Sequence, residues 1–421
     1  MKRFRNAFPV VVGVLAATAA SARADLSNRY YMPFGERAAM MGNAGITSPY
    51  GEAAFYNPAN LTRIGHPSLS VSGSTYLRYD LSADPILVLQ GEDQPFSASG
   101  FVAIPSTVTS TYKAGEFWLS TAVLVPEAIE FKNRSTFRST DLAVTLLQQR
   151  SVESLWLGGS IARELAPGLS VGVSVFVQNE SESTFNFVRV QNGFMPIMSV
   201  REVTTNEDVS VWNLTGILGV HYQASEMLGI GLRVHSPTVK LTGSADVYES
   251  TLQAGMNAAA VESEVEDVNV SRPAPADLGV GFSIRPTPRV ELVADVSLQL
   301  PGTFTTLDDP MLGVREVEVE LAPRAGIGAE IEVGSKKWLR LGAMYNASAL
   351  ATPASDADAP SDTYYGATLG FSFQKERTVT SIGLFGLQSN TAFFVEGADP
   401  QRRSDARVRL YGGLLAVSYR L

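Results

Sequence analysis

The chain has 421 residues, no cysteine and a formal net charge of −9 at pH 7. The lack of cysteine excludes a disulfide framework and a thiolate metal site, and the acidic balance argues against a nucleic-acid partner. No run after residue 24 approaches the roughly twenty apolar residues of a membrane-spanning helix, so a membrane form of this chain has to be a β-barrel.

The first 24 residues have the pattern of a signal peptide for export. A positively charged start is followed by the apolar stretch 10–19, which is too short to span a bilayer. Ala22-Arg23-Ala24 fits the small-x-small cleavage rule, so we place the mature start at Asp25. The leader carries four cations, Lys2, Arg3, Arg5 and Arg23, and its removal takes the formal charge from −9 to −13. A short N-terminal membrane anchor is the alternative interpretation.

Long stretches of the remaining chain alternate between apolar and small polar residues with period two, which is typical of β-strands. Leu69 and Val71 share one face, for example, and Ser70 and Ser72 share the other. The pattern predicts an all-β fold, a transmembrane antiparallel barrel of about fourteen strands. We expect these strands at 67–80, 97–113, 115–131, 150–164, 168–190, 206–224, 227–248, 275–286, 289–304, 314–333, 337–350, 363–375, 378–395 and 405–421.

The connections between these strands alternate between short and long, as the topology of such a barrel requires. Short turns, which belong on the periplasmic side, are expected at 166–168, 224–226, 285–288, 334–336 and 375–377. Long irregular loops, which belong outside, are expected at 132–149, 191–205, 249–274, 305–313, 351–362 and 396–404. The last strand runs to the final residue, Leu421, where many barrels of this kind end in Phe.

A compact segment rich in small residues lies between the leader and the first strand. Gly35 to Gly45 reads GERAAMMGNAG, and Ala53 to Leu61 reads AAFYNPANL. The segment resembles the N-terminal hatch of the FadL-type outer-membrane transporters of long-chain fatty acids. Further pieces of the chain resemble strands and hairpins of that family in the same order, namely 118–131, 228–247, 276–296 and 324–345.

The resemblance implies a signal peptide at 1–24, a hatch at 25–66 and a fourteen-stranded barrel at 67–421 in the outer membrane of a Gram-negative bacterium. It also implies passive uptake of fatty acids or other hydrophobic molecules. The ligand would bind in an apolar pocket and leave sideways through a gap made by a kink in the third strand. A barrel of this width, unlike an eight-stranded one, has to be plugged or form an open channel, and residues 25–67 are the segment placed to plug it.

Asn57-Pro58-Ala59 is the first candidate site, because the proline restricts its own backbone and that of Asn57. Glycines permit tight turns, so the Asn57-Pro58-Ala59 turn, together with Gly42 and Gly45, is predicted to position and gate the hatch. A simple turn before the first strand is the alternative.

Pro126 is the candidate for the kink, because proline removes a hydrogen bond from a central strand. The alternative is a proline at the outer end of that strand. Arg233, Lys240 and Arg340, with Arg324, are candidates to bind a ligand carboxylate in the lumen. The alternative for these four is that they balance lumen acids such as Glu316, Glu318, Glu320, Glu330 and Asp295.

We therefore expect a monomeric transport protein that uses no cofactor and no metal and is not an enzyme. It has three histidines, His66, His221 and His235, and the sequence pairs none of them with a serine, as a hydrolase would require. Asp356, Asp358 and Asp362 lack the spacing of a calcium loop. The expected partners are a hydrophobic ligand, lipid and lipopolysaccharide, and the barrel-assembly machinery during insertion. An aromatic-hydrocarbon channel, a scaffold or shuttle for secreted surface proteins that works through loops 249–274 and 351–362, and a soluble β-protein remain as alternatives.

Overall fold

The computed structural model describes residue 28 and residues 32–193, 199–255, 258–310, 313–350, 363–394 and 403–421. The expected signal peptide, its cleavage site and the loop with Asp356, Asp358 and Asp362 lie outside these residues. Within the described residues, no helix has the length and hydropathy needed to cross a membrane.

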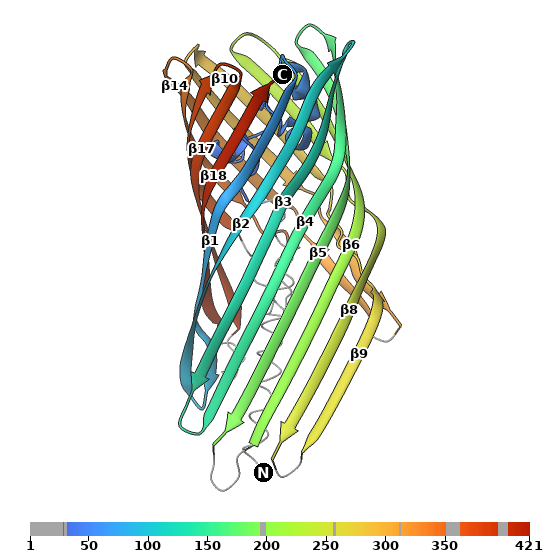
Figure 1. Ribbon diagram of the computed structural model, residues 1–421, viewed down its shortest axis with the longest axis vertical. Coiled ribbons are helices and arrows are strands. Elements are labelled where there is room, and N and C mark those ends of the chain that lie inside the picture. Colours follow the sequence, from blue (N-terminus) through green and yellow to red (C-terminus); the bar gives the residue numbers. More distant parts are fainter. Residues whose placement is uncertain are drawn as a thin grey trace.

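Fourteen strands of the described chain form a closed antiparallel ring (Figure 1), which confirms the predicted barrel. Antiparallel pairing of the first strand with the last, and of β5 with β6, completes the ring. In ring order the strands are β1 (Ser68–Leu89), β2 (Glu92–Ala114), β3 (Phe117–Arg138), β4 (Leu142–Ala166), β5 (Leu169–Asn192), β6 (Ser199–Gln223), β7 (Leu228–His235), β10 (Asp277–Thr287), β11 (Val290–Gln299), β14 (Ala322–Gly334), β15 (Lys337–Asn346), β16 (Tyr364–Lys375), β17 (Thr378–Phe394) and β18 (Arg403–Arg420).

Four further strands extend the wall at its outer end. The hairpin of β8 (Val239–Ala254) and β9 (Ala259–Asn269) pairs with the outer half of β6. The hairpin of β12 (Gly302–Asp309) and β13 (Gly313–Val319) forms a separate two-stranded sheet. Figure 1 shows that β2 to β6, together with β8 and β9, reach much further down the long axis than the strands at the other side of the barrel.

The alternation has the meaning that the sequence predicts. Leu69 and Val71 are 43% and 45% exposed and lie on the outer surface, whereas Ser70 and Ser72 are 3% and 2% exposed and face inward. Because a bilayer surrounds the outside of a barrel, the branched aliphatic face meets lipid and the small polar face lines the lumen.

Several predicted long loops are wrong, because strand structure continues through most of them. Residues 132–149 form the ends of β3 and β4, which pair from Glu127–Ser154 to Arg138–Ala143. Residues 191–205, 249–274 and 305–313 are also largely strand. At this outer end the pattern inverts, since apolar side chains such as Phe137 and Val144 are buried inside while polar ones face out. The inversion follows from water replacing lipid around the wall, and it hides the strands from a search for outward apolar faces.

The short turns lie where they are expected, at the end of the barrel that also holds the chain terminus Leu421. Near this end the segment 32–67, called the hatch segment below, folds into η1 (Ala38–Met40), α2 (Ala53–Tyr56) and η2 (Pro58–Arg63). Its blue coils lie within the ring of strands in Figure 1. It contacts β3 to β6 through η2 and β15 to β17 through η1, so it is packed between opposite walls.

Candidate functional site

Asn57 joins two parts of the hatch segment to the barrel wall. Its side-chain Nδ2 donates to the main-chain oxygen of Ile46 at 3.0 Å and to that of Val220, on β6, at 3.0 Å. Its Oδ1 accepts from the backbone N–H of Ala59 at 3.1 Å and so caps η2, with Pro58 at the first position. One amide therefore uses both donors and its acceptor, which fixes the turn and its distance from β6.

Glycines of the wall let this turn approach the strands. A Cβ at Gly219 would lie 2.0 Å from Asn57 Oδ1, and one at Gly172 would lie 2.6 Å from the backbone of Pro58 and Ala59. Since real Cβ atoms do not come that close, the Asn-Pro-Ala turn requires glycine at both wall positions.

Gly42 is constrained by contact and by conformation, and Gly45 by contact alone. Gly42 has φ of +66°, and a Cβ there would lie 2.3 Å from the carbonyl oxygen of Ala343 on β15. Its backbone N–H donates to Thr368 Oγ1 on β16 at 3.0 Å. A Cβ at Gly45 would lie 2.4 Å from the ring of Tyr56. Gly42 therefore lets the hatch segment meet the wall, Gly45 lets it pack on its own Tyr56, and the part of both glycines in gating stays a prediction.

Glu52 organises the hatch segment from within. Its carboxylate accepts from the backbone N–H groups of Glu36, Arg37 and Ala38 at 3.1–3.3 Å and from Ser48 Oγ at 2.8 Å. These hydrogen bonds hold the start of η1 against the start of α2. Burial, together with the nearby Glu52 charge, raises the pKa of Glu36 from 4.5 to about 8.

A buried charge network fastens the same region to the wall. Arg37 Nε lies 3.2 Å from Glu330 on β14, and its Nη2 lies 3.4 Å from Glu291 on β11. Arg340, on β15, is fully buried with its Nε 2.6 Å from Glu330. Arg37 and Arg340 also lie over the ring of Tyr50, at 5.9 and 5.5 Å from its centre. Arg340 is thus engaged beneath the hatch segment and does not line the pocket described next.

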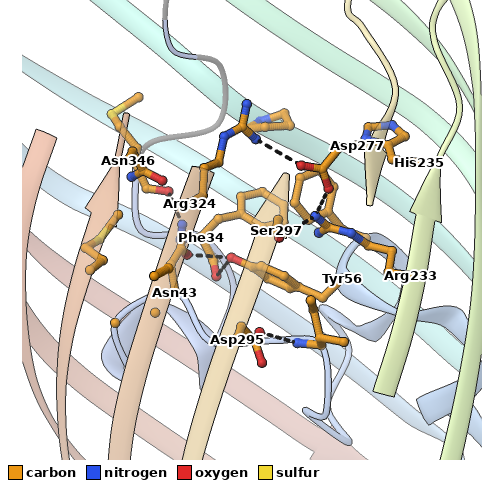
Figure 2. Close-up of a pocket in the computed structure, with 18 residues that line it drawn as sticks. Phe34, Asn43, Tyr56, Arg233, His235, Asp277, Asp295, Ser297, Arg324 and Asn346 are labelled. Atoms are coloured by element: carbon orange, nitrogen blue, oxygen red, sulfur yellow. Dashed lines mark hydrogen bonds and ion pairs between the residues drawn. The ribbon is translucent and has the colours of Figure 1, made fainter. Parts of the chain in front are cut away.

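A pocket with a cavity volume of about 60 Å³ lies between the hatch segment and the wall (Figure 2). Its apolar lining includes Met32, Phe34, Phe55, Pro126 and Met344. Its polar lining includes Arg233, His235, Asp277, Asp295, Ser297, Arg324 and Asn346. Small-molecule sites are usually concave and combine apolar side chains with placed polar groups, and this pocket has both kinds of lining.

Asn43 and Tyr56 hold the apolar lip of this pocket in place. Asn43 donates from Nδ2 to Met32 O at 3.1 Å and accepts at Oδ1 from Phe34 N at 3.1 Å. The hydroxyl of Tyr56 lies 2.5 Å from the same Oδ1. Burial and the charge of Glu52 raise the pKa of Tyr56 well above its ordinary value, so the phenol keeps the proton that it donates.

The cations of the pocket each have carboxylate partners. Arg233 on β7 forms an ion pair with Asp277 on β10, and Arg324 on β14 lies 3.9 Å from the other oxygen of Asp277. Asp295 on β11 accepts from Ile46 N at 2.7 Å. Lys240, the third predicted carboxylate ligand, lies on β8 outside the pocket, where it donates to Asn269 Oδ1 at 2.5 Å. Of the four predicted cations, Arg233 and Arg324 therefore line the pocket, whereas Lys240 and Arg340 do not.

Pro126 lies inside β3 and not at its outer end, so the interpretation as a strand end is wrong. The register with β4 shifts between Leu124 and Glu127, which makes a β-bulge at Val125 and Pro126. Within the described residues, the ladder between β2 and β3 stops at the pair Thr107–Leu124, next to this bulge. The two strands therefore separate beside the pocket that Pro126 lines.

Sequence reasoning missed Glu52 and Asp277 as site residues. Glu52 is 14 to 16 residues from the amides it binds, and Asp277 is 44 residues from Arg233. A negative residue within a small-residue segment was the available signal for Glu52. For Asp277, position 277 begins a strand whose inward face is otherwise glycine and serine, which marks a carboxylate there as unusual.

Comparisons with known proteins agree with this architecture. The family model "Outer membrane protein transport protein (OMPP1/FadL/TodX)" matches residues 13–421. No curated protein matches the sequence. A FadL homologue of Pseudomonas aeruginosa is 14% identical with a TM-score of 0.58, covering 94% of this chain and 98% of that one. The toluene transporter TbuX of Ralstonia pickettii is 17% identical, with a TM-score of 0.56 and coverage of 92% and 98%.

The toluene transporter TodX of Pseudomonas putida, 12% identical with a TM-score of 0.58, covers 93% of this chain and 98% of its own. At such identities the solved structures are evidence for the fold, whereas the family model spans nearly the whole sequence. The chain belongs to the OMPP1/FadL/TodX family of β-barrel transport proteins in the Gram-negative outer membrane.

Proposed function

We propose that this protein carries neutral hydrophobic small molecules passively across the outer membrane, through the pocket between its hatch segment and its wall. The observation that supports this most is the charge balance of the pocket. Two arginines, Arg233 and Arg324, and two aspartates, Asp277 and Asp295, line the site together with apolar side chains such as Phe34 and Phe55.

A carboxylate ligand would have to compete with Asp277 for the guanidinium groups beside it. Breaking a buried ion pair costs several kcal/mol, because one charge is left without its partner. A neutral apolar solute meets no such cost, since it can contact Phe34 and Phe55 while the polar wall keeps its own hydrogen bonds. This argument favours the aromatic-hydrocarbon channel over the fatty-acid transporter among the ligands that the sequence leaves open.

The route through the wall is part of the proposal. The hatch segment lies in the lumen on the periplasmic side of the pocket, and Asn57 and Arg37 hold it to the strands. The bulge at Pro126 and the end of the β2–β3 ladder lie beside the same pocket. We therefore favour a sideways exit between β2 and β3, toward the hydrocarbon layer, which suits a solute that dissolves in lipid. Two of the similar solved structures are those of toluene transporters.

The test is uptake of radiolabelled toluene and, in parallel, of radiolabelled oleate. Cells that lack their own proteins of this family would express the wild type or carry an empty plasmid. The proposal predicts that the wild type speeds toluene entry several-fold and oleate entry much less. Faster entry of oleate than of toluene would show that the protein prefers a carboxylate ligand. If neither solute enters faster than with the empty plasmid, the protein does not transport these hydrophobic molecules.

A further inference from the structure

The exposed cations at the periplasmic end of the barrel gather on one side of it. Three turns that follow one another around the ring, β10–β11, β14–β15 and β16–β17, are flanked by six exposed Lys or Arg residues and by two acids, Glu332 and Glu376. The cations, called the basic arc below, are Arg285, Arg289, Lys336, Lys337, Lys375 and Arg377. Arg285 binds Glu291 at 3.1 Å, whereas the other five form no ion pair within the described residues.

The other three short turns have a different charge. The turns β2–β3, β4–β5 and β6–β7 are flanked by two cations and three acids, namely Lys113, Arg163, Glu116, Glu164 and Glu226. Arg163 lies 3.4 Å from Glu116, and Lys113 lies over the ring of Trp118. The cations of this half are thus already engaged, and the free positive charge of these turns belongs to the basic arc.

The arc lies at the level where lipid head groups meet the wall. Lys337 pairs directly with Phe373 in the β15–β16 register, and Phe373, 38% exposed, ends an outward apolar row that includes Phe371. Aromatic side chains form the interfacial girdle of outer-membrane barrels. Lys375 follows Phe373 by two residues, about 7 Å along a strand, which a lysine side chain can span to reach a phosphate.

We propose that the basic arc binds the phosphate groups of anionic phospholipids in the inner leaflet of the outer membrane. Clustered cations at a membrane surface attract anionic lipids, and two-residue turns keep these side chains near the bilayer. An acidic periplasmic protein is the competing partner, but such a protein would favour charges on projecting loops rather than beside an aromatic girdle.

The basic arc lies on the side of the barrel opposite the gap between β2 and β3. From the boundary between β2 and β3, seven strands in either direction lead to the boundary between β11 and β14. The arc is centred near that boundary, so it lies across the barrel from the β2–β3 separation. Anionic lipids would therefore be held away from the side where the wall ladder is interrupted.

The experiment measures lipid retention by native mass spectrometry of the full chain released from nanodiscs with equal phosphatidylglycerol and phosphatidylcholine. The wild type is compared with Lys337→Ser plus Arg377→Ser, and with the quadruple variant that adds Lys336→Ser and Lys375→Ser. Lys113→Ser plus Arg163→Ser is the control, because it removes the same charge as the double variant from the other half of the rim. Heat-dependent gel mobility checks that each barrel is folded.

The wild type should retain phosphatidylglycerol over phosphatidylcholine several-fold, the double variant less, and the quadruple variant near equally, while the control keeps the wild-type ratio. An equal ratio in the wild type, a preference that survives in the quadruple variant, or an equal loss in the control would each overturn the proposal. Binding of polyglutamate without any lipid preference would assign the arc to an acidic protein instead and would also contradict it.

Discussion

Asn57 of the hatch segment donates a hydrogen bond from Nδ2 to the main-chain oxygen of Val220 on β6, at 3.0 Å. The same nitrogen binds Ile46 O and the same amide caps η2 through its oxygen. A single side chain therefore connects the turn of the hatch segment, an earlier part of that segment and the wall.

Asn57→Ala should loosen the hatch segment, because it removes the cap of η2 at Ala59 N and the link to the Val220 carbonyl on β6. Loss of an N-cap side chain costs about 0.5–2 kcal/mol, whereas the Ile46 carbonyl keeps Asn60 as a donor. In planar bilayers, the variant should show longer and more frequent conducting openings than the wild type. Asn206→Ala is the control, since the Asn206 side chain is on β6 but binds only Asp208 at the surface. Equal conductance of Asn57→Ala and wild type would show that the Asn57 side chain does not hold the hatch segment in place.

Gly42→Ala should destabilise the protein more than its backbone conformation alone explains. A left-handed conformation costs a non-glycine residue about 1–2 kcal/mol, and here the added methyl also meets Ala343 O at 2.3 Å. Gly115→Ala separates the two effects, because Gly115 has φ of +61° and nothing within 4 Å of its Cβ. Urea unfolding should show a larger loss for Gly42→Ala, and equal losses would mean that the wall contact is unimportant.

Asp277→Asn should shift the ligand preference toward carboxylates. The change removes the charge that pairs with Arg233 and lies near Arg324, which costs stability, about 3–5 kcal/mol for a broken buried pair. A carboxylate ligand can then replace it, so the ratio of oleate to toluene uptake should rise several-fold. Asp208→Asn, on the outer surface of β6, should leave the ratio unchanged. If the ratio of oleate to toluene uptake is unaltered in Asp277→Asn, this ion pair does not determine which ligand the protein prefers.

The stability of the hatch segment should fall as the pH rises. Glu36 is buried beside Ser70, Glu52 and Arg340, and its pKa is raised from 4.5 to about 8. The folded chain thus holds this proton more tightly than the unfolded chain. The stabilisation is therefore complete below pH 4.5, falls by up to about 1.4 kcal/mol per unit as the pH rises from 4.5 to 8, and is gone above pH 8. Urea midpoints at several pH values should show this slope in the wild type and a flatter one in Glu36→Gln; equal slopes would refute the assignment.

The fold could be predicted where the chain meets lipid, because an outward apolar face such as that of Leu69 and Val71 leaves a simple period in the sequence. It could not be predicted at the outer ends of the strands, where Phe137 and Val144 turn inward and water surrounds the wall. The alternative of Pro126 at the outer end of its strand depends on the same pattern, because the sequence predicts a strand that ends at 131 whereas β3 continues to Arg138.

The candidate site could be predicted where the signal is local. The Asn57-Pro58-Ala59 turn fixes its own backbone, and the glycine at 42 is needed for its conformation. The partners of the charged residues could not be predicted from the sequence, because residues that pair in the fold, such as Arg37 and Glu330, are 293 residues apart. Which lumen cation lies under the hatch segment, as Arg340 does, and which lines the pocket, as Arg233 does, depends on the folded barrel and leaves no pattern in the sequence.

The account rests on the pocket as the path of a neutral solute, and toluene flux into proteoliposomes tests this most directly. Ser297→Phe places a ring in the pocket, since Ser297 lines it, whereas Ser210→Phe places the same ring on the exposed surface of β6. We predict that Ser297→Phe lowers the flux several-fold and that Ser210→Phe matches the wild type. Undiminished flux through a folded Ser297→Phe barrel would contradict the account.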